Sequence, residues 1–228
     1  MYWQEDSDKK AYIVPDDIVD LAFRISCRCL PLDHAYALSQ VVLRALPWIE
    51  EKEDAGIHLI HGAESGHGWQ RPEDPDDEVL HLSRRAKLTL RLPKECIDAA
   101  KEISGVTLEI DGYPMEVGQA TVRPLSPLTT LFSRYVVASE EEDEEQFVRR
   151  AADKLMQMGI SVTKLLCGKA HVFRLPNEHI FSRRLMVADL KVEDSVKLQQ
   201  RGLGPCRKLG CGLFIPHKGI GPVNAEKE

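Results

Sequence analysis

The residues best suited to chemistry lie late in the sequence, where glycines surround a basic pair. Four glycines within eleven residues enclose two cations: Gly202, Gly204, Gly210 and Gly212, with Arg207 and Lys208. Glycine lets backbone N–H groups approach an anion closely, and a basic pair adds charge-assisted hydrogen bonds to phosphate oxygens. A helix cap followed by a sharp turn would need only one or two glycines. The pattern favours a phosphate-backbone site, and its helix-to-strand order differs from that of a nucleotide P-loop.

The middle of the sequence contains a basic stretch within an acidic chain. No acid occurs from Val79 to Lys94, although the whole sequence has 36 Asp and Glu against 30 Lys and Arg. Side chains alternate along a strand, so Arg85, Lys87 and Arg91 would share one face. That face could be an ordinary solvated surface or a track for nucleic acid. The candidate contacts of such a track, extended by a basic pair in a later strand, are Arg84, Arg85, Lys87, Arg183 and Arg184.

His34 is the histidine best placed for acid–base chemistry. It follows Asp33 at the expected start of a helix, where its ring could project from a sheet edge into a cleft. An imidazole titrates near neutral pH and can act as general base or acid. The alternative is a helix-start residue with its ring in water. His58 and His61 lie three apart in an expected strand and would face opposite sides, so they suggest no shared site.

The sequence offers no recognisable metal or cofactor site. Cys27 and Cys29 are separated by one residue, and Cys206 and Cys211 lie in the glycine-rich segment, so no pair has the spacing of a zinc knuckle. No pattern of paired carboxylates or helical histidines suggests a catalytic metal. We therefore expect no metal and no cofactor.

Composition limits the class of protein. The 228-residue chain is 43% hydrophobic, which is enough to bury a core and excludes general disorder. Its formal net charge of -6 excludes a protein-wide basic surface, so a nucleic-acid site must be a local patch. No apolar run approaches the roughly 18 residues of a membrane helix, and the acidic first residues do not resemble a signal peptide. We expect a cytoplasmic protein with reduced thiols and no membrane partner.

The elements that must position these residues follow the order β-α-β-β-α-β in the first half of the chain. Hydrophobic periodicity defines them, with Asp33 as a helix cap and a turn at Asp111-Gly112. The expected strands are 18–30, 57–60, 79–92 and 106–122, the helices are 34–48 and 94–103, and residues 64–77 form an exposed loop.

The same order begins again after a stiff linker at residues 123–127. Six acids at 140–145 suit the positive end of a helix dipole, so they mark a helix start rather than an interaction tail. That helix closes at Gly159 and another spans 192–200, while strands are expected at 131–138, 162–166, 171–175, 183–190 and 210–216. The repeated order predicts an α+β fold of two tandem ferredoxin-like (RRM-like) modules, residues 1–124 and 125–228.

Four passages together resemble a known family. They are Leu30-Pro-Leu-Asp-His34-Ala-Tyr36, Gly56-Ile-His-Leu-Ile60, Leu82-Ser-Arg-Arg-Ala-Lys-Leu-Thr-Leu-Arg91 and the glycine-rich segment Gly202 to Phe214. The last passage resembles the glycine-rich loop of the RAMP superfamily of CRISPR-associated RNA-binding proteins. In this order, and over nearly the whole chain, the passages resemble the CRISPR repeat-processing endoribonucleases, sixth of the Cas proteins, of the I-MYXAN type.

The resemblance implies a fold of two ferredoxin-like modules and a metal-independent cleavage of repeat RNA. A ribose 2'-OH attacks the adjacent phosphate, leaving a 2',3'-cyclic phosphate and a 5'-OH, with His34 as general base or acid. Arg84, Arg85, Arg207 and Lys208 are the expected contacts to the phosphate backbone of the repeat stem-loop. The enzyme would stay bound to its product beside other subunits of an effector complex.

Two alternatives remain open. A non-catalytic RNA-binding subunit of such a complex would use the same basic surface without His34 chemistry. A ferredoxin-like protein that binds a small molecule would show no salt-dependent affinity for RNA.

Overall fold

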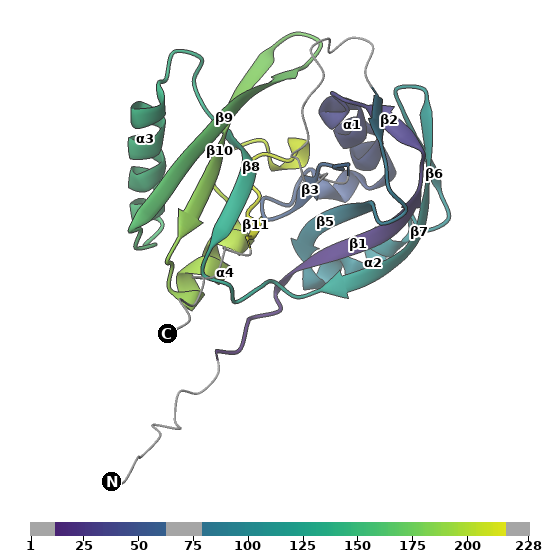
Figure 1. The fold of residues 1–228 in the computed structure, drawn as a ribbon. Coiled ribbons are helices and arrows are strands. Elements are labelled where there is room, and N and C mark those ends of the chain that lie inside the picture. Colours follow the sequence, from purple (N-terminus) through teal and green to yellow (C-terminus); the bar gives the residue numbers. More distant parts are fainter. Residues whose placement is uncertain (1–11, 63–78, 218–228) are drawn as a thin grey trace, which may run out of the picture.

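The structure, a computed structural model, describes residues 12–62 and 79–217. Within them the chain forms antiparallel sheets of five and four strands and a separate two-stranded pair. Figure 1 shows the two large sheets side by side, with the segment that follows the last helix running between them. The loop expected at residues 64–77 lies outside the described residues. None of the described helices is long and apolar enough to span a membrane.

The first module is built on a sheet with the strand order β3-β5-β1-β7-β6. Its strands are β1 (Ile18–Ser26), β3 (Gly56–His58), β5 (Lys87–Pro93), β6 (Thr107–Ile110) and β7 (Tyr113–Arg123). Helices α1 (Ala35–Ala45) and α2 (Ile97–Lys101), with the short 3-10 helices Pro47–Ile49 and Lys94–Cys96, add to the same core. Apart from the edge strand β6, this is the arrangement of a ferredoxin-like module.

Alternation along β1 and β5 separates an apolar face from a polar one. Leu21 pairs with Leu90 and Phe23 with Leu88, and all four side chains are buried in the core. Burial of each such side chain stabilises the fold by about 1.5–3 kcal/mol. The neighbouring pair, Asp20 with Arg91, points to the opposite face, which meets the second module.

The second module has the strand order β11-β8-β10-β9. Its elements are β8 (Leu131–Val137), α3 (Glu144–Gln157), β9 (Lys164–Arg174), β10 (His179–Ala188), α4 (Val192–Arg201), the 3-10 helix Arg207–Leu209 and β11 (Ile215–Pro216). Phe147, Leu155 and Leu198 of the two helices pack in the core of this module. The other face of the sheet turns toward the first module, where Tyr135 and Phe173 pack with Ala35 and Leu59.

Both modules have the predicted ferredoxin-like order, so the fold class is confirmed. The turn at Asp111-Gly112 is also confirmed: both residues have positive φ, 47° and 82°, as a type I' turn requires. The acidic run begins α3 as expected, because the Asp143 carboxylate accepts the Gln146 N–H in a capping box. The division at residues 1–124 and 125–228 stays a prediction.

Two long strands of the first module were predicted without their breaks. The expected strand 79–92 is interrupted by a turn in which the Ala86 N–H donates to the Ser83 carbonyl. Its first part, β4 (Val79–His81), pairs with β2 (Cys29–Pro31), which is itself separate from β1. Hydrophobic alternation continued across both turns, so it could not reveal them.

Other boundaries were wrong for local reasons. Residues expected as two strands, 162–166 and 171–175, form the single strand β9, whose register shift absorbs Gly168. The strand expected at 210–216 is only the two-residue β11. Asp33 does not cap α1: His34 occupies the N-cap position, and no side chain caps the helix there.

Candidate functional site

His34 lies at the junction between the two modules rather than in water. Its side chain belongs to a residue only 3% exposed. Its Nδ1 lies 2.9 Å from the Pro31 carbonyl oxygen and, because a carbonyl only accepts, carries the proton of that hydrogen bond. In the neutral ring the lone pair is therefore on Nε2, which is buried and has no hydrogen-bond partner among the described residues. The solvent-exposed alternative for His34 is wrong.

The start of α1 is held against the second module by contacts on either side of His34. The Asp33 carboxylate accepts a long hydrogen bond from the Arg174 N–H at the end of β9, at 3.4 Å. Ala35, which follows His34, is buried in one apolar cluster with Phe173 and Tyr135. The ring of His34 is thus fixed by a bond within its own module, and the residues on either side of it are held by the other.

Burial sets the charge of His34. It lowers the pKa of the imidazole, while the Pro31 carbonyl and the Asp33 carboxylate act in the opposite direction. At neutral pH the ring is uncharged, and its Nε2 can accept a proton.

A second histidine occupies the same junction. His61 stacks on Tyr135 with ring centroids 6.1 Å apart and an interplanar angle of 30°. Tyr135 also contacts His171 and Phe173, at 5.0 and 4.9 Å between centroids. Leu59, two residues before His61, packs in the same cluster as Ala35 and Tyr135. The two modules together therefore bring imidazole and phenol groups to the cluster that holds the start of α1.

Cations from the second sheet face this group of rings. Burial lowers the pKa of His61 to about 3, and the charges of Arg134, His34, His58 and Arg184 add to that effect. Arg184 was a predicted RNA contact, and the structure brings it within electrostatic reach of His61. Neutral imidazoles with two guanidiniums within electrostatic reach suit an anion that exchanges protons, such as a phosphodiester.

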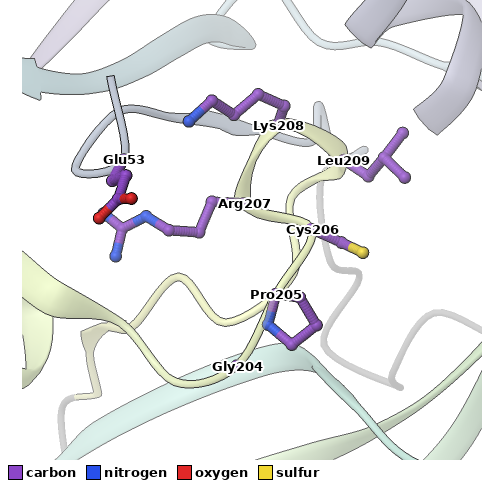
Figure 2. A pocket seen from close by; sticks show the side chains of 7 residues that line it. All are labelled: Glu53, Gly204, Pro205, Cys206, Arg207, Lys208 and Leu209. Atoms are coloured by element: carbon purple, nitrogen blue, oxygen red, sulfur yellow. The ribbon is translucent and has the colours of Figure 1, made fainter. Parts of the chain in front are cut away.

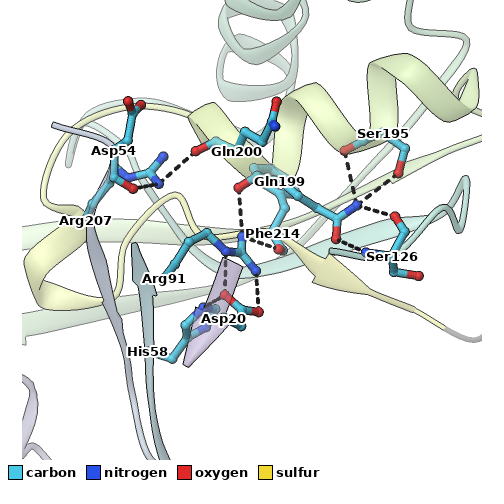
Figure 3. A network of polar contacts seen from close by, with 10 residues as sticks. All are labelled: Asp20, Asp54, His58, Arg91, Ser126, Ser195, Gln199, Gln200, Arg207 and Phe214. Carbon is cyan, nitrogen blue, oxygen red and sulfur yellow. Dashed lines mark hydrogen bonds and ion pairs between the residues drawn. The ribbon is translucent and has the colours of Figure 1, made fainter. Parts of the chain in front are cut away.

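Arg91, expected on a solvated basic face, is instead buried between the modules. It is 1% exposed, and its Nε and Nη2 donate to both oxygens of Asp20 at 2.8 and 2.9 Å. Its Nη1 donates to the Gln199 and Phe214 carbonyls of the second module, at 2.8 Å each (Figure 3). Alternation along β5 correctly predicted that Arg91 points away from the core of the first module. That face of the sheet is covered by the second module rather than by water.

The basic pair of the glycine-rich segment also joins the modules. Arg207 is 8% exposed, and its Nη2 donates to the carbonyls of Asp54 and Gln200 at 2.8 and 2.9 Å. The Lys208 Nζ donates to the carbonyls of Lys52 and Ala55. Figure 2 shows both side chains pointing toward the segment that carries Glu53. This revises the expectation for Arg207, whose guanidinium is used within the protein.

Most glycines of this segment are required by close packing. A Cβ at Gly212 would lie 2.3 Å from the Leu203 carbonyl oxygen, and one at Gly202 would lie 2.6 Å from the Gly212 oxygen. At Gly210 it would meet Leu59 of the first module at 2.8 Å. Only at Gly204 is the space open, and Gly204 borders a shallow pocket of about 480 Å³ that Arg207 and Lys208 also line. The glycines thus let the backbone pack between the modules, and Gly204 alone of the four offers room to a ligand.

The remaining predicted contacts differ in exposure. Arg84 and Arg85 are exposed in the turn before β5, and Lys87 is half-buried at its start. Arg183 donates to the Glu142 carbonyl at 3.2 Å and lies 3.6 Å from Glu144, so it supports the start of α3.

Sequence reasoning missed His61, Tyr135 and Arg134. Alternation along a strand could not bring them together, because they lie in different modules.

No group of three potential metal ligands occurs in the described part of the chain, and the six cysteines there are free thiols.

Comparison with known proteins gives consistent matches. The Cas6 family model, described as Cas6 Crispr, matches residues 19–219. The CRISPR-associated endonuclease Cas6 of Myxococcus xanthus (strain DK1622) is 31% identical over 198 residues, covering 87% of this chain and 81% of that protein.

Solved structures resemble the fold. A Cas6-related protein of Pyrococcus furiosus has a TM-score of 0.60 at 14% identity, covering 89% of this chain and 99% of its own. A RAMP protein described as binding different RNA substrates has a TM-score of 0.56 at 18% identity, covering 88% and 98%. At these identities the structural likeness supports the arrangement of the two modules alone.

Proposed function

The chain belongs to the Cas6 family of CRISPR-associated proteins, and on this premise we propose that it is an endoribonuclease that cleaves CRISPR repeat transcripts without a metal ion. The observation that carries the proposal is His34: a buried, neutral imidazole whose Nε2 lone pair has no partner among the described residues, at the junction of the modules. Such a group can take a proton from a ribose 2'-OH.

The reaction balances with groups of this chain. The 2'-oxygen attacks the adjacent phosphorus as His34 takes its proton, and the bond from phosphorus to the 5'-oxygen breaks after that oxygen gains a proton. The products are a 2',3'-cyclic phosphate and a 5'-OH. Arg134 and Arg184 stabilise the charge that develops on the phosphorane oxygens.

The proposed RNA surface combines exposed and half-buried cations with the open part of the glycine-rich segment. We retain as direct contacts Arg84, Arg85, Lys87, Arg184, Gly204 and Lys208. Arg183, Arg207, Gly202, Gly210 and Gly212 support these contacts through the fold. Such cations bind the phosphates of a repeat stem-loop, and the protein stays on its product beside other effector-complex subunits in the cytoplasm.

The direct test is incubation of the protein with its cognate repeat RNA in excess EDTA. We expect cleavage that leaves a cyclic phosphate and that stops when the attacking 2'-OH is replaced by hydrogen. Cleavage that requires added metal would contradict the mechanism. Tight binding without cleavage would favour the non-catalytic subunit. A protein that neither binds nor cuts the RNA would contradict any RNA function.

His34→Ala tests the residue. It should slow cleavage by about 10²–10⁴-fold, the usual contribution of acid–base catalysis, and leave stem-loop affinity within severalfold. His179→Ala, at the exposed start of β10, is the matched control and should cleave normally.

The RNA surface has a separate test. Arg84→Glu with Arg85→Glu should weaken stem-loop binding and reduce its dependence on salt, because fewer counterions are released. Arg149→Glu, exposed on α3, is the control. Equal affinities for both variants would remove the turn before β5 from the surface.

A further inference from the structure

We infer that His61 is the second proton-transfer residue of this active site, donating the proton to the 5'-oxygen that leaves. The inference rests on the proposed endoribonuclease function and extends it. No role follows for His61 from its sequence position, since its spacing from His58 places the two on opposite sides of the chain.

Position is the first argument. His34 begins α1 and His61 follows β3, and both approach Tyr135 of the second module through their neighbours Ala35 and Leu59. The segments that carry the two histidines thus pack on one apolar cluster of the second module, and His61 stacks on its Tyr135. In this proposal the phosphodiester binds between the two segments, with His34 on one side and His61 on the other.

The division of labour follows from the hydrogen bond to Pro31. Because the His34 Nδ1 donates to that carbonyl, neutral His34 presents a lone pair at Nε2 and is equipped as the base. An acid must then come from another group at the junction. Cleavage needs one, because an alkoxide is a poor leaving group without a proton.

The surroundings of His61 link its protonation to the substrate. The groups that act on it are the cations Arg134 and Arg184, with His34 and His58. Burial is the main cause that keeps the ring neutral in the free protein, and the cations add to it. A bound phosphodiester brings a negative charge that offsets the guanidiniums and pairs with the buried imidazolium, so His61 takes up a proton as RNA binds and passes it to the 5'-oxygen.

Other rings at the junction fit the role less well. His58 is directed toward Asp20, 3.6 Å away, in the buried network. His171 packs against Tyr135 and Phe173 within the second sheet. The phenol of Tyr135 is the remaining donor, and it can be removed without loss of the ring.

A substrate with a leaving sulfur separates the acid from the base. In an RNA whose 5'-bridging oxygen is replaced by sulfur, the thiolate leaves without a proton, because thiols are far more acidic than alcohols. His61→Asn should lower the single-turnover rate on oxygen RNA by about 10²–10⁴-fold and cleave the sulfur RNA within about tenfold of the unaltered protein. His34→Asn should be slow on both substrates.

Two further variants complete the experiment. His179→Asn should match the unaltered protein on both RNAs, and Tyr135→Phe should do so as well if the phenol is not the acid. Normal cleavage of oxygen RNA by folded His61→Asn, an equal defect on both RNAs, or a sulfur-rescued defect in Tyr135→Phe would each overturn the inference. If the unaltered protein does not cut oxygen RNA, the proposed function itself fails.

Proton uptake gives a readout that a packing role would not change. Calorimetric titration with 2'-deoxy repeat RNA, in buffers of different ionisation enthalpy, should show net proton uptake near neutral pH. The uptake should be lost in His61→Asn and kept in His179→Asn. Equal uptake in both variants would contradict the protonation step.

Discussion

The guanidinium of Arg91 contacts three parts of the chain at once: Asp20 of its own sheet, α4 through Gln199, and the segment before β11 through Phe214. Although burial raises the pKa of the Asp20 carboxyl, Arg91 and His58 hold that pKa well below its usual range. The carboxylate is therefore charged and depends on Arg91 for its balance.

Removal of this cation should be costly. Arg91→Met leaves the Asp20 carboxylate largely buried without its partner, and we expect a loss of about 3–5 kcal/mol in the free energy of unfolding, measured by urea denaturation. Arg24→Met, exposed on the neighbouring strand, should change it by about 0.5 kcal/mol or less.

A second substitution tests the cause. Asp20→Asn combined with Arg91→Met removes both charges and should recover part of the loss, since no ion remains unpaired. No recovery in the double variant would mean that the bonds to Gln199 and Phe214 alone account for the effect.

At the scale of elements, the glycine-rich segment combines two requirements that can be separated. Gly204 and Gly212 both have positive φ, 83° and 67°, so alanine is strained at either position by about 1–2 kcal/mol. Of these two positions, only at Gly212 would the new Cβ also collide with the backbone, at the Leu203 carbonyl oxygen.

We therefore expect Gly212→Ala to destabilise the protein clearly more than Gly204→Ala in parallel urea titrations. Gly204→Ala should instead affect RNA, because its Cβ enters the open space beside the pocket. Equal stability losses would contradict the packing role of Gly212.

Structure that depends on neighbouring residues in the chain could be predicted from the sequence. Structure that depends on contacts with the other module could not. The Asp111-Gly112 turn and the acidic start of α3 are local, and both were predicted. The turn before β5 kept the hydrophobic alternation, and the Arg207 pattern matched a phosphate site although the arginine is buried. Residue type and family resemblance singled out His34, which stays a prediction, whereas the position of His61 on Tyr135 depends on the packing of two sheets.

At the scale of the whole molecule, folding buries three uncharged histidines at the junction between the modules. Burial lowers the pKa values of His34, His58 and His61, with cations adding to the effect at the last two. In the unfolded chain these side chains take up protons below about pH 6.5. Acid therefore favours unfolding. The free energy of unfolding is highest above about pH 6.5, where the histidines are neutral in both states. It falls as the pH drops toward 3, the pKa of His61 in the folded protein.

Urea denaturation at pH 7.5 and pH 5.5 should show this loss of stability. His61→Asn should reduce the difference between the two conditions, and His179→Asn, whose ring is exposed, should not. An unchanged difference in His61→Asn would mean that other groups cause the acid sensitivity.

The bond from Arg207 to the Asp54 carbonyl has a consequence for biosynthesis. Its two ends are 153 residues apart in the chain. At a synthesis rate of about 5–20 residues per second, Arg207 is made roughly 8–30 s after Asp54. Until then this bond between the modules cannot form. The junction that carries His34 and His61 is thus completed only when the late segment of the nascent chain folds back onto the early one.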